Sequence, residues 1–145
     1  MVGVPDLRAP VRTVIDTNVV VSALIFASGH LHWLRHSWQS GRIVPLLDHD
    51  TAAELVRVMA YPKLELSRDD RDELLAEYLP FAEIVIPEFR DDRLPVCRDP
   101  ADVKFLRLAL AGGAAMIITG DRDPLDLAAA FPIPIVAPAQ AKELI

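Results

Sequence analysis

The feature that most constrains this chain is a regular alternation of short apolar runs with stretches of helical periodicity. Five runs rich in aliphatic side chains predict strands at residues 12–16, 43–47, 83–86, 116–119 and 133–136. Strands that are separated by helices indicate a parallel sheet with both faces covered. The alternation therefore predicts an α/β fold, with three layers (α/β/α) around a central parallel sheet of about five strands.

The segments between these runs carry helix start and stop signals as well as helical spacing of apolar residues. Asp50 or Thr51 is expected to cap a helix that ends before Pro62. Asp99 followed by Pro100 is a strong helix start. The predicted helices cover residues 19–27, 30–40, 52–61, 67–79, 99–111, 125–130 and 138–144.

The size and composition indicate one globular domain. With 145 residues, 52% apolar and 25% charged, the chain is long enough for a real core and is not of the disordered class. Residues 1–11, with Pro5 and Pro10, are interpreted as a leader, and residues 12–145 as the domain. The single cysteine, Cys97, excludes an internal disulfide framework and fits a reducing cytoplasm.

The apolar run at residues 19–27 follows Arg8 and Arg12, in the manner of a signal peptide. It is short, and Asp16 and Asn18 stand at its start. A signal peptide or a membrane span is therefore not expected, and neither is a membrane partner.

Four acids fall where predicted strands end or helices begin. Asp16 ends the first strand, Asp121 follows the fourth, Asp102 lies in the first turn of a helix, and Glu54 lies on the helix over 52–61. Because ligands collect outside the carboxyl ends of parallel strands, we expect these acids to converge. Two carboxylates about 4 Å apart repel by roughly 4 kcal/mol at an effective dielectric near 20, so four of them need a cation.

The expected donors are all oxygen, with no His or Cys at metal spacing, which favours Mg²⁺ or Mn²⁺ over Zn²⁺. Such a site performs metal-assisted phosphodiester chemistry, often with two ions. Asp123 is a candidate fifth acid, and Thr17, Asn18 and Thr119 are candidates for hydrogen bonds that orient the acids. Every acid except Asp16 also has a purely structural alternative as a cap, a turn residue or a solvated helix residue.

The net charge of −6 argues against a protein that coats nucleic acid nonspecifically, but not against a nucleic-acid enzyme. Basic side chains could form a small rim that holds phosphates, although each one taken alone is more simply solvated surface. The candidates for this rim are Arg35, Arg42, Lys63, Arg98, Lys104 and Arg122.

Three segments resemble the motifs of PIN-domain ribonucleases. Ile-Asp16-Thr-Asn18-Val-Val-Val-Ser-Ala-Leu resembles the family's opening motif. Arg-Asp99-Pro-Ala-Asp102-Val-Lys-Phe-Leu and Thr-Gly-Asp121-Arg-Asp123 are similar to its third and fourth motifs. The resemblance covers residues 12–145, with the motifs in order, and is strongest to the VapC-like toxin branch of toxin–antitoxin systems.

This resemblance implies a Mg²⁺- or Mn²⁺-dependent endoribonuclease that hydrolyses RNA and is the toxin of a type II toxin–antitoxin pair. It implies that Asp16, Glu54, Asp102 and Asp121 form the catalytic, metal-binding quartet, with Asp123 in support. A small antitoxin protein and a homodimer are the partners that it implies.

Three other functions compete with this interpretation. A haloacid-dehalogenase-type phosphatase would need an acid two residues after Asp16, where this chain has Asn18. A receiver domain would need an acid pair beside the first strand and a phosphorylatable aspartate on a central strand, and neither is present. The alternative that stays open is a weakly active or non-catalytic PIN module that binds RNA or a partner protein.

Overall fold

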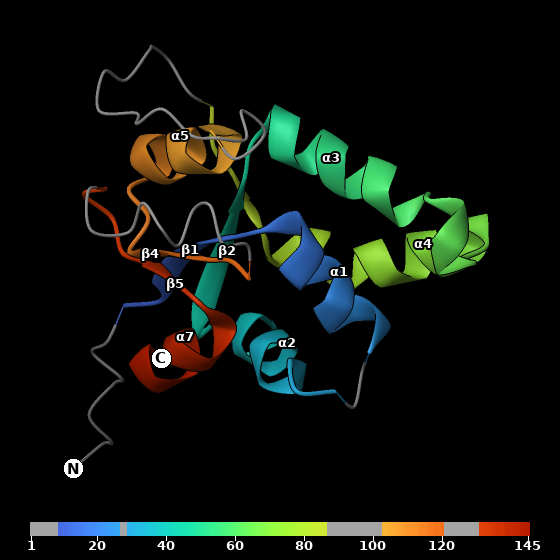
Figure 1. The fold of residues 1–145 in the computed structure, drawn as a ribbon, viewed down its shortest axis with the longest axis horizontal. Helices are drawn as coiled ribbons and strands as arrows, with labels where there is room; N and C mark the ends of the chain where they lie inside the picture. The colour runs from blue at the N-terminus through green and yellow to red at the C-terminus, as the bar shows by residue number, and fades with distance from the viewer. Residues whose placement is uncertain (1–8, 27–28, 87–102, 121–130) are drawn as a thin grey trace.

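The computed structural model describes residues 9–26, 29–86, 103–120 and 131–145, and these confirm the alternation of strands and helices (Figure 1). The strands are β1 (Val11–Ile15), β2 (Ile43–Leu47), β3 (Glu83–Ile84), β4 (Met116–Ile118) and β5 (Ile135–Val136). The α-helices are α1 (Thr17–Ile25), α2 (His32–Gln39), α3 (His49–Met59), α4 (Arg68–Ala76), α5 (Val103–Gly112) and α7 (Pro138–Leu144), with short 3₁₀ turns at Pro62–Leu64 and Leu79–Phe81.

The strands form one five-stranded sheet in the order β3-β2-β1-β4-β5, and every neighbouring pair is parallel. The chain moves outward from β1 through β2 to β3, and then places β4 on the other side of β1. The boundary between β1 and β4 is therefore the point where the strand order reverses. In open α/β sheets the ligand crevice lies at such a point, outside the carboxyl ends of the strands.

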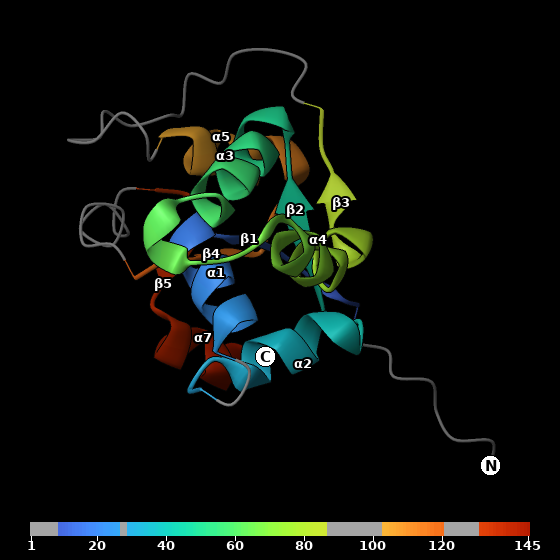
Figure 2. The same cartoon turned by 90° about the vertical axis from the view of Figure 1, so that its right-hand side faces the viewer.

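Alternate residues of each strand pack on opposite faces of the sheet. Ile15 lies in a core with α1, α2, α3 and α7, whereas Val14 lies in a second core with α5. Figures 1 and 2 show α5 apart from α2 and α7, with the sheet between them. The three-layer α/β/α fold expected from the sequence is confirmed.

Arg12 ties the start of β1 to the end of α5. Its guanidinium donates from Nε and Nη2 to the carbonyl of Gly112, at 3.0 and 2.8 Å, and forms an ion pair with Glu83 of β3. A cation at the carboxyl end of a helix is favoured by the helix dipole. This contact helps to hold α5 against the sheet.

One helix cap differs from the expectation. The prediction that Asp50 or Thr51 caps the helix over 52–61 is wrong, because α3 begins at His49 with Asp48 as its N-cap. Asp48 Oδ1 accepts from the Thr51 amide at 2.9 Å, and the Asp48 amide donates to Thr51 Oγ1 at 3.0 Å. Asp48 follows β2 directly, so this reciprocal capping box turns the chain from strand to helix without a loop.

Other boundaries shift by a few residues. The helix predicted over 67–79 ends at Ala76, because Pro80 lies in a separate 3₁₀ turn, and the strand predicted over 83–86 is confined to Glu83–Ile84. The predicted helix at 125–130 and the expected start of a helix at Asp99 lie outside the described residues. The division into a leader and a domain stays a prediction. Within the described ranges, no helix is long and apolar enough to cross a bilayer.

Trp38 and Tyr78 form an aromatic contact in the core. Their rings meet edge to face, with centroids 4.8 Å apart, and Trp38 Nε1 donates to the Glu77 carbonyl at 3.0 Å. The Tyr78 hydroxyl is buried and has no hydrogen-bond partner in the described part of the chain. Burial raises the pKa of this hydroxyl above its ordinary value.

We expect Tyr78→Phe to raise the free energy of unfolding by about 1 kcal/mol, because it removes a buried hydroxyl that makes no hydrogen bond. The folded state disfavours the tyrosinate, so the wild type should also lose stability more steeply than the variant as the pH rises above about 10. Urea unfolding at pH 7 and pH 10.5 measures both effects. A variant less stable than the wild type would contradict the prediction.

Candidate functional site

Asp16 sits between the end of β1 and the start of α1 and is almost completely buried, at 4% exposure. Its Oδ1 accepts from the backbone amide of Asn18 at 3.2 Å, which makes Asp16 the N-cap of α1. Its Oδ2 accepts from Thr119 Oγ1 at 2.7 Å. Both carboxylate oxygens therefore have a donor, and the positive end of the α1 dipole favours the negative charge.

Thr119 directly follows β4 and lies beside the Asp16 carboxylate. Ile118 pairs with Ile15 in the β1–β4 register, so the residues that follow, Thr119 and Asp16, are also neighbours. The Asp16 amide donates to the Ile118 carbonyl at 2.9 Å, and the Thr119 amide donates to Val136 at 3.0 Å. Backbone pairing on both sides of β4 thus fixes the hydroxyl that contacts Asp16.

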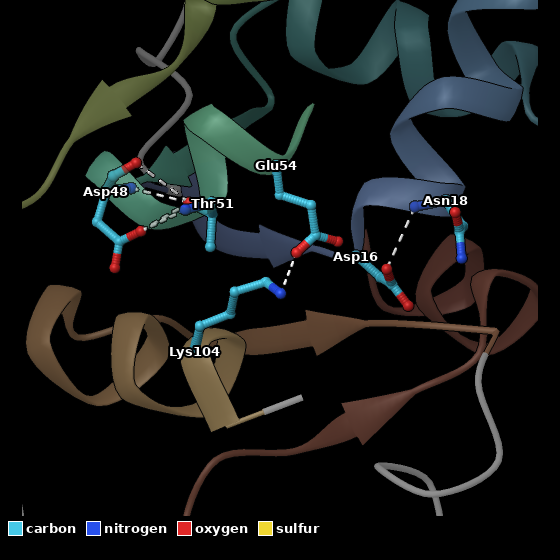
Figure 3. A network of polar contacts seen from close by, with 6 residues as sticks. All are labelled: Asp16, Asn18, Asp48, Thr51, Glu54 and Lys104. Carbon is cyan, nitrogen blue, oxygen red and sulfur yellow. Dashed lines mark hydrogen bonds and ion pairs between the residues drawn. The ribbon is translucent and has the colours of Figure 1, made fainter. Parts of the chain in front are cut away.

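Glu54 reaches the same edge from α3. Its side chain is 17% exposed, and its buried Oε2 forms an ion pair with Lys104 Nζ of α5. Helices α3 and α5 pack on opposite faces of the sheet. The ion pair therefore spans the carboxyl edge of the sheet and connects the helical layers on its two faces (Figure 3).

Figure 3 shows one Glu54 oxygen turned to Lys104 and the other turned to the side where Asp16 lies. The structure thus brings two members of the predicted quartet to one edge of the sheet. Asp102, Asp121 and Asp123 lie outside the described residues, and their roles stay predictions. In the chain, Asp102 directly precedes α5, and Asp121 follows Thr119 by two positions. Within the described ranges, no three acids, histidines or cysteines gather as a metal site.

Thr17 and Asn18 flank Asp16 in different ways. Thr17 is buried as the first residue of α1, whereas Asn18 is exposed and contacts Asp16 through its backbone amide. That amide contact would exist with almost any residue at position 18. The expected orienting roles of the two side chains therefore stay predictions.

The described donors fit a hard divalent cation. The Asp16 and Glu54 carboxylates offer only oxygen, which suits Mg²⁺ or Mn²⁺ better than Zn²⁺. Each Asp16 oxygen has more than one lone pair, so the contacts to Asn18 and Thr119 leave acceptor capacity on this carboxylate for a metal.

Lys104 is the residue whose place the sequence did not reveal. The sequence places it among the candidates for a basic rim, but the structure pairs it with Glu54. Of the other rim candidates, Arg35 pairs with Glu77, and Arg98 and Arg122 lie outside the described residues. The sequence signal that could have placed Lys104 at the site is its position two residues after Asp102, in the first turn of a helix.

Three comparisons with known proteins agree with this architecture. The sequence model of the PIN domain matches residues 12–123. This chain belongs to the PIN-domain family. As a family, PIN domains are nucleases, a class of hydrolases.

The chain is similar to the uncharacterized protein MJ1680 of Methanocaldococcus jannaschii, with 29% identity over 129 residues, covering 83% of this chain and 77% of that protein. Its fold matches a chain of VapBC2 from Rickettsia felis, crystallised with a DNA fragment from the promoter, with a TM-score of 0.60, 12% identity and coverage of 87% and 98%. It also matches PAE2754 from Pyrobaculum aerophilum, with a TM-score of 0.56, 15% identity and coverage of 90% and 92%. At these identities the two structures show a shared fold.

We expect Thr119→Val to lower the free energy of unfolding by about 2 kcal/mol, because a buried carboxylate loses a hydroxyl donor. Thr13→Val is the matched control, since Thr13 is also buried but donates only to a backbone carbonyl of its own strand. Urea unfolding of both variants measures the difference. Equal losses in the two variants would mean that the Thr119–Asp16 bond does not stabilise the fold.

Proposed function

We propose that this PIN domain is an endoribonuclease that hydrolyses RNA phosphodiester bonds with the help of Mg²⁺ or Mn²⁺. The observation that carries the proposal is the buried Asp16 carboxylate, held at the β1–β4 boundary with Glu54 at the same edge. A buried anion at the ligand-binding edge of an α/β sheet is costly for folding alone, and a phosphodiester-cleaving site gives it a use.

The metal would be held by Asp16, Glu54, Asp102 and Asp121, with Asp123 in support. When bound, the ion supplies an activated water and stabilises the charge on the leaving oxygen. The chain contributes orientation. The Asn18 amide and the Thr119 hydroxyl hold the two Asp16 oxygens in fixed directions, so no reorganisation of this carboxylate is needed during the reaction.

We further propose that the chain is the toxin of a type II toxin–antitoxin pair and works in the cytoplasm as a homodimer with a small antitoxin partner. The shared fold with a chain of the VapBC2 complex supports a partner protein. Some exposed side chains are apolar, which supports surfaces that are covered in an assembly. They are Val56 on α3, at 51% exposure, Tyr61 just after α3, at 42%, and Ile84 in β3, at 62%.

We expect Asp16→Asn to lower RNA cleavage with Mn²⁺ by at least about a hundredfold, because Asp16 would hold the cation that stabilises the negative charge of the transition state, and losing such stabilisation typically costs that much. The wild type should gain ~2.7 kcal/mol of stability at a hundredfold excess of Mn²⁺ over its dissociation constant, and the variant less. Cleavage of a labelled RNA and thermal melting with and without Mn²⁺ are the measurements.

Asp50→Asn is the matched control, because Asp50 lies on the exposed first turn of α3 and loses the same charge. It should cleave like the wild type. RNA binding in EDTA without any cleavage in Mn²⁺ would overturn the proposal that the chain is an endoribonuclease. It would favour a non-catalytic module that binds RNA.

For the toxin assignment, induced expression of the wild-type chain in a bacterial host should arrest growth, and Asp16→Asn should relieve the arrest at equal protein level. Growth curves and immunoblots measure this. Unimpaired growth with active nuclease in the lysate would separate the nuclease from a toxin role.

A further inference from the structure

We propose that Lys104 is an internal counter-ion of the site, which must release Glu54 before a divalent cation uses that carboxylate, so that Lys104 sets the metal affinity. This inference rests on the proposed function, because it concerns the same metal. It assigns a role to a residue of α5 that the acidic quartet does not include.

The first observation is the burial of the pair. The side chains of Glu54 and Lys104 are only 17% and 19% exposed, and Glu54 Oε2 is itself buried. Exposed ion pairs contribute little, but removing one partner of a buried pair leaves a costly uncompensated charge. Lys104 therefore neutralises Glu54 in the protein without metal.

The second observation is where the ammonium sits. Lys104 comes from α5 and crosses the carboxyl edge of the sheet to reach α3, which is the edge where Asp16 is held. Its Nζ also lies over the ring of Phe105, 5.3 Å from the centroid. A ring face attracts a cation, so this position is suited to a positive charge even before any metal arrives.

These placements put two cations in competition for one carboxylate. A metal ion that binds Glu54 at Oε2 must take the place of Lys104, and one that binds the other Glu54 oxygen lies beside the ammonium, so that release of the lysine relieves the repulsion between the two cations. In both cases the bound lysine weakens metal binding. A lysine that only anchored RNA phosphate would need its ammonium free, whereas here the ammonium is paired with a buried oxygen.

The first test is Lys104→Met, which keeps the length of the apolar stem and removes the charge. Isothermal titration should show Mn²⁺ binding about tenfold tighter than in the wild type, equal to about 1.4 kcal/mol. Without metal the variant should melt below the wild type, because Glu54 has lost its partner, and saturating Mn²⁺ should close that gap.

Lys142→Met is the matched control. Lys142 is exposed on α7 and lines a hollow with Arg42, which precedes β2 and so lies at the amino edge of the sheet. Its loss should leave Mn²⁺ affinity unchanged. Unchanged affinity in Lys104→Met would reduce the ion pair to a structural contact, and weaker affinity would make Lys104 a residue that positions Glu54 for metal. Either result overturns the proposal.

The second test uses the wild-type protein and does not depend on the folding of a variant. Acetylation of lysine amines, followed by mass spectrometry, should label Lys104 slowly without metal and at least about three times faster with saturating Mn²⁺, since the amine leaves its buried partner. The exposed Lys63 and Lys142 are internal references and should not change.

The two proposals fail in different ways. Mn²⁺ that stabilises the protein while Lys104 labelling stays constant would refute the counter-ion role and leave the nuclease intact. If Mn²⁺ changes neither the melting temperature of the wild type nor the acetylation of Lys104, the proposed metal site is wrong, and the counter-ion role is wrong with it.

Discussion

The site depends on the register of β1 against β4. Ile15 lies beside Ile118, and this pairing delivers Asp16 and Thr119 to the same point at the carboxyl edge. The resulting 2.7 Å hydrogen bond joins residues 103 positions apart in the chain. A slip of one residue would turn the alternating side chains to the opposite faces and separate the hydroxyl from the carboxylate.

Two acids at this edge have polar partners of different kinds. Asp16 uses neutral donors, namely the Asn18 amide in the first turn of its own helix and the hydroxyl of Thr119, which follows β4. Glu54 uses a full positive charge from a helix on the other face of the sheet. In the proposed metal site, the first arrangement would leave the carboxylate in place when a cation binds, whereas the second would have to be exchanged. A single site can therefore combine one acid whose hydrogen bonds persist with another acid whose partner is exchanged.

Much of the fold can be predicted from the sequence, because apolar residues recur clearly with the spacing of helices and strands. The segment from Ile43 to Leu47 is a strand with the predicted bounds, and the helix at Pro138–Leu144 also has its predicted ends. The cap of α3 was misassigned because Asp48, Asp50 and Thr51 are all good capping residues, and only the path of the chain out of β2 selects Asp48. Local propensity ranks such candidates but does not choose between them.

The sequence by itself determined the parallel α/β architecture and the sheet edge at which Asp16 lies, because both follow from the order of strands and helices. Only the tertiary structure decided that Thr119, one of three candidates for orienting the acids, donates to Asp16, and that Lys104 pairs with Glu54. Thr119 and Lys104 are far from their partners in sequence, and nothing in the local pattern says that a helix on one face will reach an acid on the other. Such pairings depend on the packing of whole elements against the sheet, which no short segment encodes.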